Sequence, residues 1–256
     1  MAWQLAASYP DYFYQLATLV RDPVYRNPEM VDGRGQPILL IPGFLAGDWT
    51  LMRMAGWLNR LGYRAYFSGI DWNVDCPNKT SEKLRWRLDH IANETSEPLN
   101  VIGHSLGGLL ARFLGANFSD RVCHVIALGA PLNVNDPESV HPLVRSAFQL
   151  LTPLRRLRGG VDPQCGSTAC SCRFARTAFS TLPIAVRSTS IFSKSDEIVD
   201  WRSAIDPNGE NFEVSGRHLG LIVNREVYQV IAQVLNAYTV INRPISSLLG
   251  NKMVSR

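Results

Sequence analysis

Short apolar runs alternate with helix-length segments along most of this chain, and this alternation restricts the fold more than any other feature. The runs are typical of buried β-strands and fall at residues 38–41, 64–67, 99–102, 122–128 and 190–193. Between them, apolar residues recur at three- and four-residue spacing, which predicts helices at residues 51–61, 84–91, 106–114 and 223–234. Thr80 or Ser81 could cap the second of these helices. Strands of this kind separated by helices predict an α/β fold, with a mostly parallel central sheet and helices on both of its faces.

The composition is that of an ordinary globular chain. With 256 residues, 46% of them apolar and 19% charged, it is neither disordered nor collagen-like, and it is long enough for one large domain over residues 1–256. The first residues carry no basic segment ahead of an apolar one, and no run approaches the roughly 18 apolar residues that a membrane span needs. We therefore expect a soluble, cytoplasmic chain whose contact with a membrane, if any, is peripheral.

One segment, at about residues 133–183, breaks the alternation. It has no clear strand and contains five prolines and three of the five cysteines. Residues 139–187 contain seven arginines and one acidic residue. The net charge of this segment is therefore +6, whereas the whole chain carries +4. Insertions of this length inside compact domains commonly have a function, and we expect a lid or cap over the carboxyl edge of the sheet.

The arginines of this segment indicate one kind of surface. Arg155, Arg156 and Arg158 are interleaved with apolar residues, which are Phe148, Leu150, Leu151, Leu154 and Leu157. A mixed apolar and cationic surface suits peripheral contact with an anionic lipid interface. The alternative is an ordinary solvated face of the lid.

The cysteines of the segment leave three alternatives open. Cys165, Cys170 and Cys172 lack the paired spacing of a structural zinc site. They could be three thiolate ligands of a metal, or Cys165 could form a disulfide with Cys170 or Cys172, or all three could be reduced thiols. Because the five cysteines of the chain do not form a disulfide framework, a reducing compartment is the default expectation.

A glycine-rich turn follows the predicted strand at 99–102 directly and opens the next helix: Gly103-His104-Ser105-Leu106-Gly107-Gly108. A serine at a sharp strand-to-helix turn has a strained backbone, and small residues two before and two after it let the chain pass itself. The start of the helix offers unpaired N–H groups to a developing oxyanion, with the N–H of Leu106 as the natural donor. The pattern predicts that Ser105 is a catalytic nucleophile; the alternative is a glycine-rich junction with an idle serine.

A second oxyanion donor is expected from the loop after the first strand, which begins Pro42-Gly43-Phe44. Gly43 lets the backbone approach a reacting carbonyl, and the N–H of Phe44 would then point to where the second donor is needed. The alternative is a simple turn that ends the strand.

His218 is the candidate base. It lies in a glycine-flanked loop between a strand-like run at residues 211–214 and the last helix, and such a loop can carry a base to the serine. Of the other histidines, we expect His104 and His124 to be packing residues and His90 to lie near solvent.

Asp196 is the candidate acid, with Glu197 and Asp200 as competitors. It comes just after the strand at 190–193, at the end of a strand where open parallel sheets bind their ligands. Its carboxylate would fix the tautomer of His218 and stabilise the imidazolium that forms when Ser105 loses its proton. The chain order of serine, acid and histidine is that of one fold in particular.

Together these motifs resemble the α/β-hydrolases of the lipase and esterase type. The resemblance rests on GHSLGG after a strand, IPGF after an early strand, SKSDEIV after a late strand and GRHLGL before the final helix. It covers about residues 38–238, apart from the insertion. It implies a Ser-His-Asp esterase mechanism with a lid over the carboxyl edge of the sheet. Pro42 stands where many members of the family have histidine, although several lipases share the proline.

The residues and the resemblance predict a serine hydrolase of carboxylic esters. It would act through an acyl-enzyme on a small-molecule ester or lipid, with an apolar acyl chain. We expect no cofactor, no metal, no nucleic-acid partner and no obligate protein partner. An acyltransferase, a thioesterase or an amidase could use the same triad, and a non-catalytic binding protein with the hydrolase fold is the alternative from another class. The presence of serine, acid and base argues against that last alternative.

Overall fold

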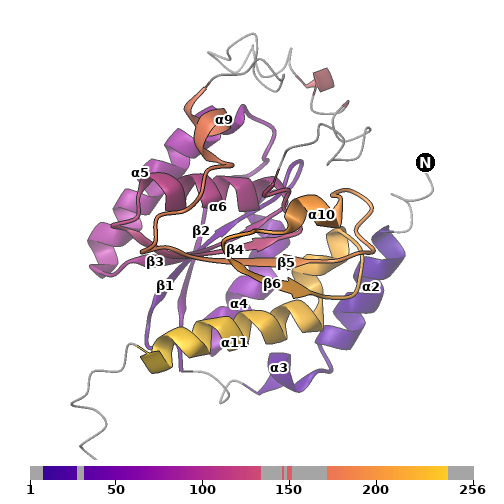
Figure 1. The fold of residues 1–256 in the computed structure, drawn as a ribbon. Coiled ribbons are helices and arrows are strands. Elements are labelled where there is room, and N and C mark those ends of the chain that lie inside the picture. Colours follow the sequence, from indigo (N-terminus) through magenta and orange to yellow (C-terminus); the bar gives the residue numbers. More distant parts are fainter. Residues whose placement is uncertain (1–7, 28–31, 134–145, 147–148, 152–171, 242–256) are drawn as a thin grey trace, which may run out of the picture.

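A six-stranded parallel sheet forms the centre of the molecule (Figure 1). The computed structural model describes residues 8–27, 32–133, 146, 149–151 and 172–241, with side chains as far as residue 236. Every pair of neighbouring strands is parallel, in the order β2-β1-β3-β4-β5-β6. The strands are β1 (Pro37–Ile41), β2 (Arg64–Phe67), β3 (Leu99–His104), β4 (Val122–Leu128), β5 (Arg187–Phe192) and β6 (Glu210–Glu213). The predicted α/β class with a parallel sheet is confirmed.

Helices cover both faces of the sheet (Figure 1). On one face lie α2 (Ser8–Leu19), α3 (Pro23–Arg26), α4 (Met52–Arg60) and α11 (Arg225–Ile241), and on the other lie α5 (Pro77–Thr95), α6 (Leu106–Asn117) and α9 (Arg173–Thr177). The central strands feed both sides, because successive side chains of a strand point to opposite faces. Ile38 and Leu40 of β1 belong to one hydrophobic cluster, and Leu39 and Ile41 belong to the other. Burial on both faces explains why the central strands are apolar without alternation.

The four predicted helices form. The ends of α4 agree with the prediction within one residue and α6 begins at the predicted residue, whereas α5 and α11 are several residues longer than predicted. The largest difference is in α5, where Thr80 and Ser81 are buried inside the helix and do not cap it. The helix begins instead at Pro77, and the cap position is Cys76, whose side chain makes no capping hydrogen bond. Proline suits the first helical position because it lacks an N–H and its φ is already helical.

The end of the predicted insertion is anchored on the α5–α6 face. Phe174 of α9 is buried, its ring centroid lies 5.9 Å from that of Phe113, and its N–H donates to Asn78 Oδ1 at 3.1 Å. Leu150 is exposed and Leu151 is half-buried. The other apolar residues expected in the lid, the arginines at 155, 156 and 158, and the cysteines at 165 and 170 lie outside the described residues. A lid over the carboxyl edge therefore stays a prediction.

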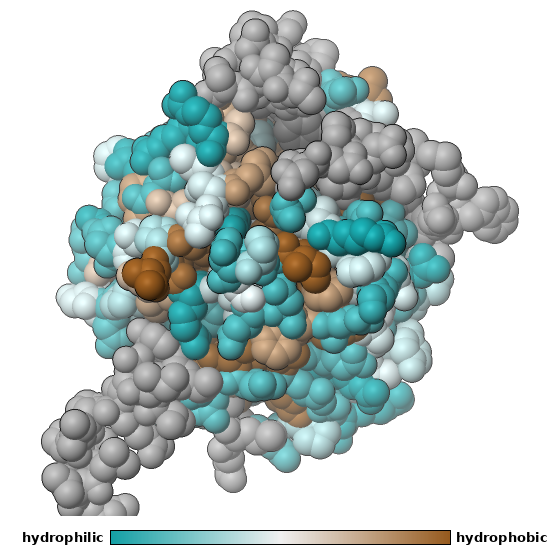
Figure 2. Space-filling view, viewed as in Figure 1, coloured by the Kyte–Doolittle hydropathy of each residue, from teal (hydrophilic) through white to brown (hydrophobic). Residues whose placement is uncertain are grey.

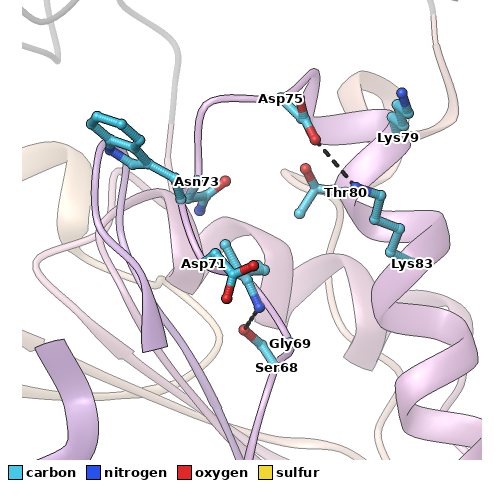
Figure 3. A pocket seen from close by; sticks show the side chains of 10 residues that line it. Ser68, Gly69, Asp71, Asn73, Asp75, Lys79, Thr80 and Lys83 are labelled. Atoms are coloured by element: carbon cyan, nitrogen blue, oxygen red, sulfur yellow. Dashed lines mark hydrogen bonds and ion pairs between the residues drawn. The ribbon is translucent and has the colours of Figure 1, made fainter. Parts of the chain in front are cut away.

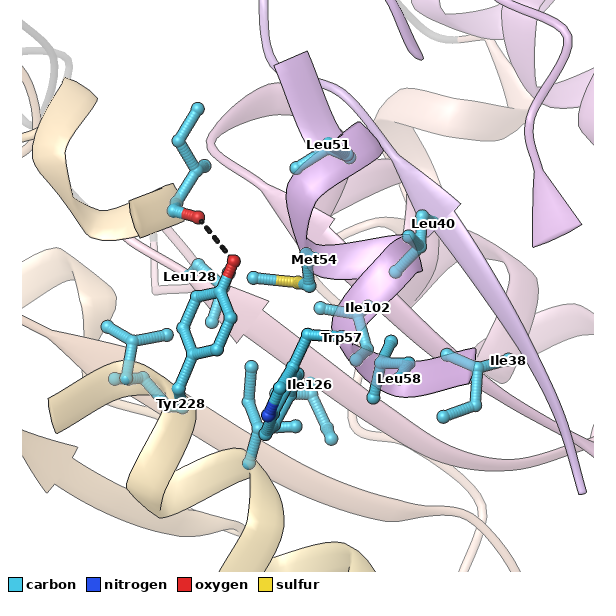
Figure 4. Packing of buried hydrophobic residues seen from close by; sticks show 14 of the residues in the cluster. Ile38, Leu40, Leu51, Met54, Trp57, Leu58, Ile102, Ile126, Leu128 and Tyr228 are labelled. Atoms are coloured by element: carbon cyan, nitrogen blue, oxygen red, sulfur yellow. Dashed lines mark hydrogen bonds between the residues drawn. The ribbon is translucent and has the colours of Figure 1, made fainter. Parts of the chain in front are cut away.

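The largest buried side chains meet between α4 and α11 (Figure 4). Trp57 is 1% exposed, its ring centroid lies 4.5 Å from that of Tyr228, and its Nε1 donates to Val24 O at 2.8 Å. The hydroxyl of Tyr228 donates to Ile222 O at 3.3 Å. Both aromatic side chains thus bury a large area while their polar atoms keep a partner.

The outer surface is largely polar on the side seen in Figure 2, where hydrophilic residues predominate and apolar ones form small groups between them. Within the described ranges, no helix is long and apolar enough to cross a membrane.

The packing of Trp57 predicts a large and specific loss of stability. Trp57→Ala should lower the free energy of unfolding by about 3–5 kcal/mol, because it removes a fully buried ring and leaves Val24 O without its donor. Trp86→Ala is the matched control, since Trp86 is 67% exposed on α5, and it should change stability by no more than about 0.5 kcal/mol. Urea titration followed by circular dichroism measures both, and equal losses would contradict this account of the core.

Candidate active site

Four loops that carry the predicted site residues leave the same edge of the sheet. The loop with Phe44 follows β1, Ser105 follows β3, Asp196 follows β5 and His218 follows β6. Because all strands are parallel, these loops all lie at the carboxyl edge. Ligand sites of open parallel sheets lie at that edge.

Ser105 sits in a strained turn between β3 and α6. Its φ is +54° and its ψ is −121°, a conformation that few residues other than glycine adopt. A Cβ at Gly103 would overlap the carbonyl oxygen of Gly107, and a Cβ at Gly107 would overlap that of Ile41. The N–H of Ser105 donates to Leu128 O at 2.8 Å, which ties the turn to the end of β4. Both glycines are therefore required by close backbone approaches, as the spacing predicts.

The loop after β1 lies directly against this turn. A Cβ at Gly43 would be 3.2 Å from Ser105 Cβ and 3.0 Å from His104 Nδ1. The backbone at Phe44 is thus brought next to Ser105, while Leu106 begins α6, where the first N–H groups have no partner within the helix.

A second segment, residues 68–73, holds the loop after β1 in place. Asn73 Nδ2 donates to Pro42 O at 2.8 Å, Leu45 N donates to Asn73 O at 3.1 Å, and Asn73 N donates to Ala46 O at 2.7 Å. The carboxylate of Asp48 accepts from the N–H groups of this segment at residues 68, 69 and 70. No motif in the sequence marks this support.

A pocket of about 360 Å³, lined mostly by polar residues, lies between the same segment and the start of α5 (Figure 3). Asp71 and Asn73 from the loop face Thr80 and Lys83 of α5 across it, and Lys83 Nζ lies 3.2 Å from Asp75 Oδ2. None of the predicted catalytic residues lines this pocket. It therefore belongs to the support of the loop and does not contain the candidate site.

The carboxylate of Asp196 and the imidazole of His218 form a buried pair. His218 Nδ1 lies 2.7 Å from Asp196 Oδ2, and the two side chains are 5% and 2% exposed. The other carboxylate oxygen, Oδ1, accepts from Ile198 N at 2.8 Å and Val199 N at 2.9 Å. Gly129 lies beneath the pair with φ +53°, and a Cβ there would be 3.0 Å from Asp196 Oδ2. The pair is thus oriented from several sides.

The two competing acids have other contacts. Asp200 caps α10 (Trp201–Ala204) by accepting from Arg202 N at 3.0 Å. The side chain of Glu197 is buried, but its Oε2 accepts from the backbone N–H of His218 at 3.3 Å and does not reach the ring. Geometry therefore favours Asp196 as the partner of the imidazole.

The remaining histidines are only partly as expected. His90 is exposed, and His124 is buried between Thr189 and Arg187. His104, expected to be a packing residue, also contacts the candidate base: its Nε2 lies 3.1 Å from His218 O, and the two ring centroids are 4.7 Å apart. Its position next to Ser105 in the sequence was the one available sign of this contact.

The pKa values of the His104 and His218 rings are shifted in opposite directions. Burial, reinforced by the charge of His218, lowers the pKa of His104 to about 3, so this ring is neutral and can donate through Nε2 to the carbonyl of His218. Burial also acts to lower the pKa of His218. The charge and hydrogen bond of Asp196, followed by the charge of Glu197, outweigh it and raise that pKa above the ordinary imidazole value.

The side chain of Ser105 makes no hydrogen bond within the described part of the chain, to His218 or to any other residue. The serine is nevertheless linked to the pair through its neighbours, since Ser105 N bonds Leu128 O and the next residue, Gly129, lies against Asp196 and His218. Catalytic hydrogen bonds are often long in a ligand-free enzyme and shorten when substrate binds.

No cluster of metal-ligating side chains exists among the described residues. Cys172 Sγ accepts from Ala175 N at 3.4 Å, at the start of α9. The other two cysteines of the insertion lie outside the described ranges, so their state stays a prediction.

Comparisons with known proteins agree on the fold. No protein-family model matches the chain, and no curated protein matches its sequence. Among many solved structures that match, a monoacylglycerol lipase from Paleococcus ferrophilus is 17% identical, with a TM-score of 0.57 over 81% of this chain and 96% of that one. A mature lipase from Bacillus licheniformis is 16% identical, with a TM-score of 0.57 over 80% and 94%. A soluble variant of the monoglyceride lipase of Saccharomyces cerevisiae is 16% identical, with a TM-score of 0.54 over 81% and 87%. The chain has the α/β-hydrolase fold, as the resemblance of its motifs implies.

Gly107, in the turn at Ser105, and Gly56, in α4, have different surroundings. Replacing each with alanine should therefore change the free energy of unfolding in opposite directions. Gly107→Ala should lower the free energy of unfolding by about 1–3 kcal/mol, because its Cβ meets backbone carbonyls at the end of β1 that cannot easily move. Gly56→Ala should raise it by about 0.5–1 kcal/mol, because Gly56 lies within α4 with open space around its Cβ position. Chemical unfolding measures both, and tolerance of Gly107→Ala would refute the close approach.

Proposed function

We propose that this protein is a serine hydrolase of carboxylic esters. The observation that carries the proposal is the buried pair of His218 and Asp196, 2.7 Å apart, beside a serine with a positive φ. A buried carboxylate that orients an imidazole next to an activated serine is the arrangement used for acyl transfer through a covalent intermediate.

In the proposed reaction, Ser105 Oγ attacks the ester carbonyl while His218 Nε2 accepts the serine proton. Asp196 stabilises the imidazolium, and the N–H groups of Phe44 and Leu106 donate to the oxyanion of the tetrahedral intermediate. Collapse of the intermediate breaks the bond to the alcohol, which takes the proton from His218 and leaves an acyl-enzyme. A water molecule, deprotonated by the same imidazole, then attacks the acyl-enzyme. When the second tetrahedral intermediate collapses, the bond to Ser105 Oγ breaks, Oγ takes the proton back from the imidazolium, and the acid is released.

The proposed substrate is a small-molecule ester or lipid with an apolar acyl chain. The solved structures named above include enzymes described as monoacylglycerol lipase and lipase, which is consistent with such a substrate. An anionic lipid interface stays a proposed partner for the arginines at 155, 156 and 158. Their placement lies outside the described residues.

The nucleophile is tested by removing its hydroxyl. Ser105→Ala should lower the rate of hydrolysis of a p-nitrophenyl ester by at least about 10³-fold, because no other group in the mechanism can form the acyl-enzyme. Ser119→Ala is the control, since Ser119 is exposed in the turn after α6 and should leave the rate unchanged. Full activity in Ser105→Ala would refute the proposal.

The proposed role of His218 as the base predicts how kcat/KM depends on pH. His218 accepts a proton only when it is neutral, so kcat/KM should fall as the pH falls through the pKa of this imidazole in the free enzyme. Because Asp196 and Glu197 raise that pKa, the fall should occur at a higher pH than the value of about 6.5 for an ordinary imidazole. A pH profile of kcat/KM on a soluble ester measures this, and a midpoint below about 6.5 would contradict the assignment.

A matched substrate panel separates the alternatives. Esters of rising acyl length, with a thioester and an amide of the same acyl group, should show that the ester is cleaved fastest. An added alcohol acceptor should not divert most of the acyl group from water. Preference for the thioester, the amide or the acceptor would replace ester hydrolysis with that reaction, and failure of Ser105 to react with a fluorophosphonate would favour a binding protein.

A further inference from the structure

The first two turns of helix α2 bury polar side chains and expose aromatic ones. Ser8 and Gln15 are 1% and 5% exposed, whereas Tyr9, Phe13 and Tyr14 are about two-thirds exposed. Tyr12 and Leu16 pack against the core and Leu19 is buried in it, so α2 has an apolar stripe. The buried polar side chains at the start of the helix add polar contacts to this packing.

Those contacts are to the loop that carries His218. The N–H of Arg217 donates to Asp11 Oδ2 at 2.9 Å, and Gln15 Nε2 donates to Asp11 Oδ1 at 3.3 Å. The next N–H along the chain, that of His218, donates to Glu197 Oε2 at 3.3 Å. Two successive N–H groups of the base loop are thus bound by two carboxylates, one from α2 and one from the turn after β5.

Ser8 links the second carboxylate, that of Glu197, to α2, the helix that carries Asp11. Its hydroxyl donates to Glu197 Oε1, so α2 contacts the base loop directly through Asp11 and indirectly through Glu197. The approach is close, because a Cβ at Gly220 would overlap Asp11 Oδ2 and a Cβ at Gly216 would be 2.8 Å from Gln15 Nε2. The helix and the loop are packed together without intervening space.

The burial of Glu197 is not explained by stability alone. Its side chain is 4% exposed, and its one cationic neighbour in the described part of the chain, Arg217, lies 3.8 Å away. A buried carboxylate is costly to desolvate, and Glu197 is next in sequence to Asp196, a second buried acid. Two negative charges in this place become favourable when a positive charge forms on His218.

We propose that Asp11 and Glu197 are positioning residues for the base, and that helix α2 is thereby part of the working site although it lies far from Ser105 in sequence. The inference rests on the proposed function and deepens it. Asp11 and Glu197 hold the backbone on the N-terminal side of His218, while His104 binds its carbonyl and Asp196 binds its ring. Glu197 also adds negative charge beside the imidazolium.

The groups around His218 allow the effect of charge on its pKa to be measured separately from the effect of backbone positioning on the rate. Asp196, Glu197 and His104 face its ring or its peptide, and Asp11 and Arg217 flank the loop. Of the two positioning carboxylates, Glu197 is the one that raises the pKa of His218. Glu197→Gln keeps an acceptor for the N–H of His218 but removes the charge, whereas Asp11→Ala removes the acceptor for the N–H of Arg217.

The experiment combines kinetics with NMR titration of the His218 ring in the full chain. Glu197→Gln should lower the pKa of His218 and move the acidic limb of kcat/KM to lower pH. Asp11→Ala should lower kcat about 10-fold and leave that limb in place, because it releases a hydrogen bond to a charged group that orients the base. Asp200→Asn removes an exposed carboxylate from the same turn and should change neither quantity.

The outcomes separate this inference from the proposed function. If Glu197→Gln leaves the pKa of His218 unchanged and Asp11→Ala keeps the wild-type kcat, the positioning role is refuted. If the wild-type protein cleaves no ester but Glu197→Gln still lowers the pKa of His218, ester hydrolysis fails and the effect of the Glu197 charge on the imidazole stands. Should Asp11→Ala not fold, Ser8→Ala removes the donor to Glu197 with a smaller change, and an unaltered kcat there would count against the role of α2.

Discussion

Parallel pairing of all six strands is the constraint on which the rest of the site depends. In an antiparallel sheet, alternate loops would leave opposite edges, but here the loops after β1, β3, β5 and β6 all leave one edge. The strand order then sets their spatial order: the Phe44 loop beside Ser105, Gly129 next, then Asp196 and then His218. Neighbours in this row pack closely, since an added Cβ at Gly43 would be 3.2 Å from Ser105 Cβ and one at Gly129 would be 3.0 Å from Asp196 Oδ2.

The parts that could be predicted from the sequence are those with local causes. The strands at 64–67 and 122–128 have the predicted ends. The second is buried along its whole length, which explains its nearly continuous apolar run, whereas the residues of the first are exposed or half-buried. The turn at Ser105 was predictable because Gly103 and Gly107 are required by backbone contacts within and beside the turn. The start of α5 differs from the prediction, because Pro77 occupies the first helical position and Thr80, a residue type that suits a cap, lies inside the helix.

The parts that could not be predicted depend on contacts between distant segments. His104 and His218 are 114 residues apart, and Ser8 and Glu197 are 189 residues apart. No periodicity or spacing marks such pairs, and a buried serine or glutamate looks like a surface residue in a sequence. Helix α2 is hard to predict for a related reason. Tyr12, Leu16 and Leu19 face the core, but buried Ser8 and Gln15 and exposed aromatic residues obscure this apolar stripe.

The site contains features that reduce the stability of the fold, and the residues that carry them indicate how the site would work. Ser105 has a strained φ, worth about 1–3 kcal/mol, and the buried carboxylates of Asp196 and Glu197 must be desolvated. In return, His218 is held at its N–H, its carbonyl and Nδ1 before any substrate arrives. The side chain of Ser105, by contrast, has no hydrogen bond in the described part of the chain, and rotation about its χ1 changes the position of Oγ alone. In the proposed reaction the base is therefore preorganised, and the small adjustment that brings Oγ to Nε2 falls to the serine, where it disturbs no other contact.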